Sequence, residues 1–143
     1  MRRTPLARKG KTETAKIKDR IQGLLRSYCL LRDGGCVLAP FQGNGDIPMC
    51  CSDVLQCDHL NSRQFSVSYA NPHLAVIVCK GHHGWKHFSD RNTRIYMELV
   101  RKIIGPRRAK MLEMVENDRS SHRMTAWDWE KEALALENMI ENF

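Results

Sequence analysis

The chain has 143 residues, with 23 lysines and arginines against 16 aspartates and glutamates and a formal net charge of +7. This length predicts one domain with one modest core, and the positive surplus favours a polyanionic partner such as a nucleic acid. No apolar run is long enough to cross a membrane and no secretory signal is recognisable, so we expect a cytoplasmic protein with no membrane partner. Its cysteines are expected to be metal ligands or packed thiols rather than disulfides.

The first segment, residues 1–12, is basic and has too few apolar groups to fold alone, so it is predicted to be a flexible arm. Its candidate contacts to a nucleic-acid backbone are Arg2, Arg3, Arg8 and Lys9. A solvated tail has equal weight as an interpretation. The remainder, residues 13–143, is predicted to form a single domain. It opens with an amphipathic helix over 13–32, because apolar residues recur at steps of three and four until Gly34.

Soft and borderline donor atoms predict a structural zinc site made by Cys36, one of Cys50 and Cys51, Cys79 and His82. Cys79 and His82 form a C-x-x-H step that leads into a helix, which is half of a zinc knuckle. Adjacent cysteines do not easily point at one ion, so one of the pair is expected to bind and the other to pack. Cys51 is slightly preferred because it leaves the shorter connection to the next strand, with Cys50 as the alternative.

Two strands and one helix are predicted next, at residues 53–59, 74–78 and 81–88. A polar loop over 61–71 is expected between the strands. The predicted fold class is α+β. A small core at about residues 53–88 is expected to need bound zinc for its stability. It lies between the N-terminal helix and a helical C-terminal part over 90–143.

Four residues of this core predict a phosphodiesterase site with one catalytic metal ion. The i, i+4 spacing puts His83 and His87 on one face of a helix, where both imidazoles can reach the same cation. Asp58 can supply a third, hard oxygen ligand. His59 projects differently from Asp58 and is free to take a proton from an attacking water. Mg²⁺ or Mn²⁺ is the expected ion, and Ni²⁺ or Zn²⁺ also suits this donor set.

Two further cations of the core are candidates for DNA contact. Arg63 closely follows the first strand and suits a phosphate clamp, although a simple surface arginine is the weightier interpretation. Lys86 lies between the two ligand histidines, and its ammonium suits phosphate contact because it has no lone pair for a metal.

Three helices are predicted after the core. The first begins at an N-cap, Asp90 or Asn92, and ends at Gly105, after which the second begins directly. The third opens at Thr125 with a capping box and carries Trp127 on its apolar side. Its tryptophans and methionines are expected in the core.

The Asp-His pair on a strand, followed by a helix with His-x-x-x-His, resembles the metal motif of the HNH, or ββα-metal, endonucleases. The resemblance implies that the three ligands and the general base keep the roles given above. It also implies a middle motif residue just before the second strand, usually an asparagine that braces the loop carrying the base. Asn71 is preferred by residue type, and His73 is about as close in register.

The order of a basic arm, a helix, a split zinc site, the metal motif and a final Trp-bearing helix is similar to the phage recombination nucleases of the Rap/NinG type. The similarity covers most of the chain in layout, but only the metal motif is specific. It implies a bacterial or phage endonuclease that cuts branched recombination intermediates, with DNA as partner and a recombinase or a second copy of the chain as further candidates. The alternatives are a non-enzymatic zinc-binding DNA-binding module and a nonspecific nuclease acting as a toxin or defence effector.

Overall fold

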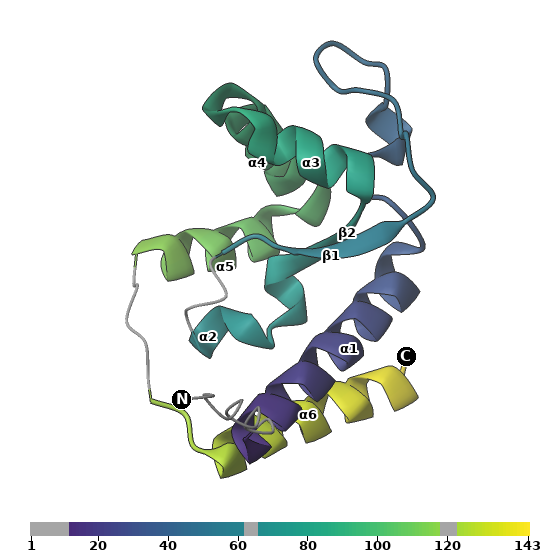
Figure 1. The fold of residues 1–143 in the computed structure, drawn as a ribbon. Helices are drawn as coiled ribbons and strands as arrows, with labels where there is room; N and C mark the ends of the chain where they lie inside the picture. Colours follow the sequence, from purple (N-terminus) through teal and green to yellow (C-terminus); the bar gives the residue numbers. More distant parts are fainter. Residues whose placement is uncertain (1–11, 62–65, 118–122) are drawn as a thin grey trace, which may run out of the picture.

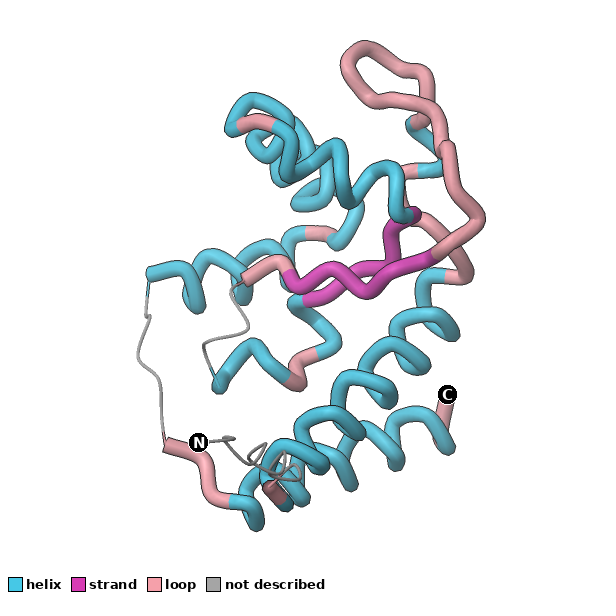
Figure 2. Tube along the Cα trace, in the orientation of Figure 1, coloured by secondary structure: helices cyan, strands magenta, loops and turns pink. Residues whose placement is uncertain are grey.

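The computed structural model describes residues 12–61, 66–117 and 123–143. The fold is α+β, with helices around a two-stranded antiparallel sheet (Figures 1 and 2). In chain order the elements are α1 (Glu13–Asp33), the 3-10 helix η1 (Ala39–Phe41), β1 (Leu55–His59), α2 (Ser66–Tyr69), the 3-10 helix η2 (Pro72–Leu74), β2 (Ala75–Cys79), α3 (Lys80–Phe88), α4 (Asp90–Ile104), α5 (Pro106–Asn117) and α6 (Ala126–Glu141). Within the described part of the chain, none of the helices combines the length and the apolar character that crossing a membrane requires.

Helix α1 begins and ends where local chemistry predicts. The Thr12 hydroxyl accepts a hydrogen bond from the backbone N–H of Ala15, which satisfies one of the free donors of the first turn. At the other end Gly34 adopts a φ of 72°, a left-handed conformation that glycine takes at little cost. The predicted helix over 13–32 is therefore confirmed.

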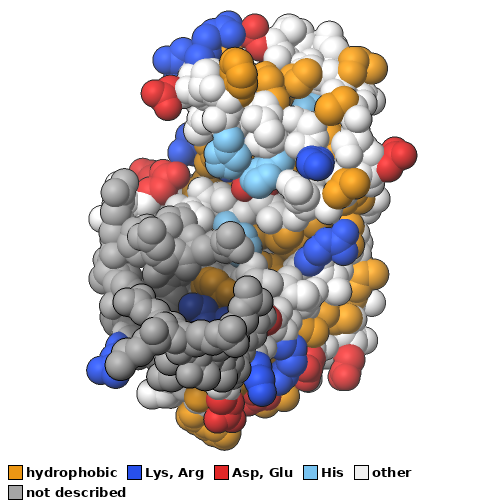
Figure 3. Space-filling model, in the orientation of Figure 1, with side chains coloured by type: hydrophobic (Ala, Val, Ile, Leu, Met, Phe, Trp, Pro, Cys, Tyr) orange, Lys and Arg blue, Asp and Glu red, His pale blue; other side chains and the backbone are white. Residues whose placement is uncertain are grey.

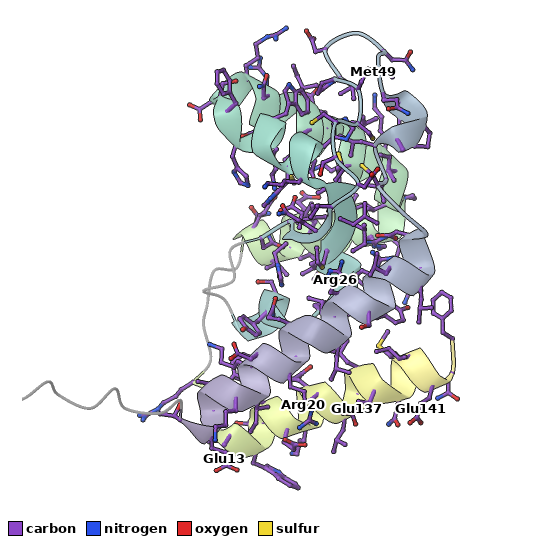
Figure 4. The ribbon with its side chains drawn as sticks, turned by 45° about the vertical axis from the view of Figure 1, so that its right-hand side comes forward. Glu13, Arg20, Arg26, Met49, Glu137 and Glu141 are labelled. Atoms are coloured by element: carbon purple, nitrogen blue, oxygen red, sulfur yellow. The ribbon has the colours of Figure 1, made fainter. Side chains whose placement is uncertain are left out.

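Helix α6 lies alongside α1 and closes one side of the core (Figure 1). The contact is mainly apolar, with Trp129 and Leu136 of α6 buried among α1 side chains. Arg20 of α1 also reaches across to Glu130 at 2.9 Å. It lies 3.3 Å from Glu137 as well, and Figure 4 shows Arg20 and Glu137 on the two neighbouring helices. These ion pairs are exposed and add little stability, so burial of apolar surface holds the two helices together.

Strand β2 is buried on both faces and joins two halves of the core. Alternate side chains of a strand point to opposite faces. Ala75 and Ile77 accordingly pack against α1 and α6, whereas Val76 and Val78 pack with apolar residues of α4 and α5. The continuous apolar run of this strand thus reflects cover on both sides.

The strand register sends Asp58 and His59 to opposite faces of the sheet. Asp58 pairs with Val76 and His59 pairs with Ala75, and directly opposed side chains share a face. Asp58 therefore points toward the α3 and α4 side, and His59 points toward the other side. The expectation that the two neighbours project differently is confirmed.

Two local predictions differ from the structure in the connecting segments. The predicted loop over 61–71 contains the short helix α2. Helix α4 is capped by Ser89 rather than by Asp90 or Asn92, because the Ser89 hydroxyl accepts the backbone N–H of Asn92 at 3.1 Å. A serine directly before an acidic first turn is a strong N-cap, so the cap lies one residue earlier than predicted.

Helix α6 has its predicted start but a different tryptophan in the core. Thr125 and Asp128 form the predicted capping box, each side chain accepting the other's backbone N–H. The structure exposes Trp127 by 66% and leaves only 6% of Trp129 exposed. The apolar face that meets α1 therefore runs through Trp129, and the expectation for Trp127 is wrong.

Candidate metal centres

Four donor atoms converge at the start of α3 in a Cys₃His cluster. They belong to Cys36, Cys50, Cys79 and His82, and all lie within 4.8 Å of one another. The Nδ1 atom of His82 is 3.3 Å from the Cys36 sulfur, 3.7 Å from the Cys50 sulfur and 3.2 Å from the Cys79 sulfur. Tetrahedral zinc with bonds of about 2.0–2.3 Å separates its ligand atoms by roughly 3.5–3.8 Å. The cluster could therefore bind a structural zinc ion.

The ring of His82 is fixed in the orientation that a metal ligand needs. Its Nε2–H donates to the backbone oxygen of Pro48 at 2.7 Å, so the lone pair lies on Nδ1, which faces the three sulfurs. Cys79 caps α3, and its sulfur accepts the backbone N–H of His82 at 3.3 Å. The helix start thus holds two of the four donors.

The thiols of this cluster influence one another's protonation. Burial and the neighbouring Cys36 and Cys79 raise the pKa of Cys50 to about 12, because each additional thiolate in the cluster would repel the others. A bound cation reverses this effect and makes the deprotonated thiols favourable.

The preference for Cys51 over Cys50 is corrected by the structure. The backbone N–H of Cys50 donates to the Gln42 side-chain oxygen at 2.9 Å, which holds Cys50 with its sulfur toward the cluster. Cys51 is exposed, and its sulfur lies so close over Gly81 that a Cβ there would overlap it. Glycine at position 81 therefore makes room for the cysteine that does not join the cluster.

Zinc content should separate the two adjacent cysteines. Cys50→Ser removes one of four donors and is expected to lose most of the bound zinc, whereas Cys51→Ser is expected to keep it. Metal analysis of the two purified variants, side by side with the unsubstituted protein, measures this directly. Retention of zinc in Cys50→Ser together with its loss in Cys51→Ser would contradict the assignment.

A second cluster lies on the neighbouring stripe of the same helix. Asp58, His83 and His87 place one donor atom each within 4.8 Å of the others. The Nε2 atom of His83 is 3.4 Å from Asp58 Oδ1 and 3.2 Å from His87 Nε2. Atoms that share one ion at about 2.0–2.2 Å lie roughly 3–3.5 Å apart, so this donor set fits a single divalent cation.

Hydrogen bonds orient the donors of this second cluster. Gln56 lies two residues before Asp58 on the same face of β1, and its side-chain oxygen accepts the Nδ1–H of His83 at 2.7 Å. The lone pair of His83 therefore lies on Nε2, toward Asp58 and His87. Burial, together with the charge of the neighbouring Lys86, lowers the pKa of His87, which favours the neutral form of this ring that binds metal.

Asp58 is buried but ionised. Burial alone would raise its pKa, but the contact with His83, the Lys86 charge and the Tyr96 hydroxyl outweigh burial and lower the pKa to about 2. The Lys86 ammonium lies 2.7 Å from Asp58 Oδ2, and the Tyr96 hydroxyl donates to the same oxygen at 2.6 Å. Oδ1 is the oxygen that faces the histidines.

The prediction that Lys86 contacts DNA phosphate is wrong for this structure. Lys86 is 6% exposed, and its ammonium is occupied by Asp58 beneath the ring of Tyr96. Helical spacing explains the difference: residues 82 and 86 share the inward stripe of α3, whereas 83 and 87 share the stripe next to it. A lysine between two ligand histidines therefore points away from the surface that they share.

His59 shares a pocket of about 460 Å³ with the three ligand residues. The Nε2 atom of His59 lies 3.3 Å from the backbone oxygen of Tyr69. Because a carbonyl oxygen can only accept a hydrogen bond, Nε2 carries the proton and Nδ1 is the basic nitrogen. Figure 3 shows histidine side chains gathered on one face of the molecule. The pocket lining comprises Gln22, Gln56, Cys57, Asp58, His59, Asn61, His83 and His87.

Several pocket residues were not predicted from the sequence. Gln22 of α1 donates to the same Tyr69 oxygen as His59, at 3.2 Å, and so supports the residue that orients the ring. The Oδ1 atom of Asn61 is buried and has no hydrogen-bond partner among the described residues. The period-2 pattern of β1 could have indicated Gln56, since it shares a face with Asp58. Gln22 lies far away in the sequence and carries no local signal.

Neither candidate for the middle motif position lines the pocket. The Asn71 side chain accepts the backbone N–H of His73 at 3.0 Å and lies 3.6 Å from the sulfur of Met111, which makes it the cap of η2. Burial and the charge of Arg108 lower the pKa of His73, whose backbone oxygen accepts from Arg108 at 2.9 Å. Both residues thus belong to the junction with α5.

The candidate DNA contacts Arg2, Arg3, Arg8, Lys9 and Arg63 lie outside the described residues. Comparisons with protein-family models, with curated proteins and with solved structures found no match. Helix α3 carries histidines of two separate clusters of potential metal ligands.

Proposed function

We propose that this protein is a metal-dependent endonuclease of the HNH, or ββα-metal, type that hydrolyses phosphodiester bonds in DNA. The observation that carries the proposal is the pocket in which His59 lies beside the convergent donors of Asp58, His83 and His87. A zinc-binding module alone would need only the Cys₃His cluster. The second cluster, with an adjacent histidine whose basic nitrogen is defined, is what hydrolysis requires.

The residues of the pocket have distinct roles in this mechanism. A divalent ion bound there would polarise the scissile phosphate and stabilise charge on the leaving oxygen. His59 accepts the proton of the attacking water at Nδ1, because its Nε2–H is engaged with the Tyr69 carbonyl. Gln56 holds His83 in its ligand tautomer, and the Tyr96 hydroxyl holds the Asp58 carboxylate in place.

The surroundings of the pocket support a polyanionic substrate. The chain has a surplus of seven positive charges, which attracts the phosphate backbone of DNA without sequence preference. The Cys₃His cluster joins the start of α3 to the segment before β1, and zinc there would hold the helix that carries the ligands. Mg²⁺ or Mn²⁺ suits phosphate chemistry, and the two imidazoles also admit Ni²⁺ or Zn²⁺.

Branched DNA is the proposed substrate class within this function. The layout similarity to the Rap/NinG-type recombination nucleases supports it, and a cellular partner recombinase or a dimer would follow from the same similarity. Two alternative functions predict different properties. A nonspecific nuclease would have the same pocket, whereas a non-enzymatic module would have only DNA binding and zinc in common with the proposed enzyme.

A panel of DNA structures tests this proposal. Purified protein should cut a four-way junction and splayed DNA faster than matched linear duplex or single strands, with Mg²⁺ or Mn²⁺ and not with EDTA. Equal rates on all structures would indicate a general nuclease instead of a recombination nuclease. DNA binding with no cutting under any metal would contradict the enzyme and leave the zinc-binding module.

A further inference from the structure

A buried lysine lies directly behind the candidate catalytic metal site. The Nζ atom of Lys86 is 2.7 Å from Oδ2 of Asp58, while Oδ1 of the same carboxylate is 3.4 Å from the His83 Nε2 donor. Asp58 is 3% exposed and Lys86 is 6% exposed, so water screens this pair very little. One carboxyl group therefore separates a fixed positive charge from the place where a divalent cation would bind.

The charge balance of the site follows from this contact. His83 and His87 are neutral ligands, and Asp58 supplies the only negative charge of the donor set. The Lys86 ammonium already balances that charge, so these four described residues together offer an incoming divalent cation no net negative charge. A buried ammonium this close to a metal site also repels the ion.

Lys86 is not the only residue that holds the Asp58 carboxylate in place. The Tyr96 hydroxyl donates to the same Oδ2 at 2.6 Å and is fully buried, so it holds the carboxylate independently of the lysine. The Lys86 ammonium additionally lies 4.7 Å from the centre of the Tyr96 ring. Orientation and charge are thus supplied by two different residues, which allows each to be removed separately.

We propose that Lys86 weakens metal binding in the free protein and makes metal binding depend on an incoming phosphate. A phosphodiester at the pocket brings the negative charge that Lys86 has cancelled, so metal and DNA bind cooperatively. This inference rests on the proposed function for the identity of the phosphate donor. Its consequence is that the site holds its ion mainly when substrate is present.

Mn²⁺ titration of the zinc-loaded protein tests this role without measuring cleavage. Lys86→Gln keeps a side-chain N–H donor near Oδ2 and removes the charge, and it should bind Mn²⁺ roughly tenfold more tightly or better. Lys80→Gln makes the same charge change at an exposed position of α3 and should alter the affinity by less than about twofold. Tyr96→Phe removes orientation without charge and should not tighten binding.

The dependence on phosphate is measured in a His59→Ala background, where we expect DNA to be cut at least about 10²-fold more slowly. Duplex DNA should tighten Mn²⁺ binding strongly when Lys86 is present and much less in the protein that also carries Lys86→Gln. Equal Mn²⁺ affinities with and without the Lys86→Gln substitution, or weaker binding after it, would overturn the proposed role of Lys86. This outcome would leave the proposed nuclease function standing.

Two results keep the proposal and the proposed function distinguishable. If neither protein binds Mn²⁺ with or without DNA, the metal site itself is absent and the nuclease fails with it. If Lys86→Gln does not fold, the protein with Lys86 still decides the matter: Mn²⁺ affinity unchanged by DNA would overturn the proposal, and affinity raised by DNA would support it.

Discussion

Replacing His59 by alanine is expected to lower the rate of DNA cleavage by about 10²-fold or more. The substitution removes the nitrogen that accepts the proton of the attacking water, while Asp58, His83 and His87 remain in place. DNA binding and zinc content should therefore stay unchanged. Single-turnover cleavage, measured beside equilibrium DNA binding, separates the loss of chemistry from a loss of substrate.

His73 offers a matched control for this experiment. It is the other histidine considered for the motif, but it lies at the junction with α5 and does not line the pocket. His73→Ala should cleave within a few-fold of the unsubstituted protein. If the two alanine variants lose activity equally, or if His59→Ala is fully active, the assignment of the general base is wrong.

Replacing Cys79 by serine is expected to unfold the protein through the loss of zinc. A structural zinc site contributes about 10–16 kcal/mol in small domains, which matches or exceeds the roughly 5–15 kcal/mol that typically separates folded from unfolded chains. Cys79 also caps α3 and ends β2, so its loss acts on the helix that carries His83 and His87 and on the strand paired with the one that carries Asp58.

Metal analysis and thermal unfolding measure this effect together. The variant should lack zinc and show no cooperative transition, and the unsubstituted protein stripped by a chelator should behave in the same way. That agreement would separate loss of the ion from loss of a buried thiol. A Cys79→Ser protein with unchanged zinc content and melting temperature would rule out the structural site.

Elements with strong periodic patterns could be predicted from the sequence. Helix α1, the buried strand β2 and the capping box of α6 follow from apolar spacing and local hydrogen bonding, and all three are confirmed. Helix α2 was missed because four residues carry too little periodicity to be recognised. Trp127 was misplaced because its exposure depends on how α6 rotates against α1, and that angle is a tertiary property.

Local patterns likewise predict one part of the candidate site and not the other. The donors of the second cluster could be predicted because His83 and His87 share a helix face and Asp58 precedes them on a strand. The choice of Cys50 over Cys51 depended on a hydrogen bond from Cys50 to Gln42 and on contact with Gly81, which sequence spacing does not contain.

The contacts of Lys86 could not be predicted from the sequence either. Lys86 of α3 and Tyr96 of α4 reach the same oxygen of Asp58 only because both helices pack at this side of β1. A surface lysine near a phosphodiesterase motif is an ordinary phosphate contact, and burial is what makes this one different. Tertiary contacts of this kind join residues far apart in the chain and leave no local pattern.

The central claim is that one pocket binds a divalent ion and hydrolyses phosphodiester bonds. The most direct test is nicking of supercoiled plasmid DNA by the zinc-loaded protein in Mn²⁺, compared with EDTA and with the His83→Ala variant. We expect nicking in Mn²⁺ that EDTA abolishes and that the variant lacks, although its zinc content and melting temperature are retained. Nicking that persists equally in His83→Ala, or its absence from the intact protein in every divalent metal, would contradict the account.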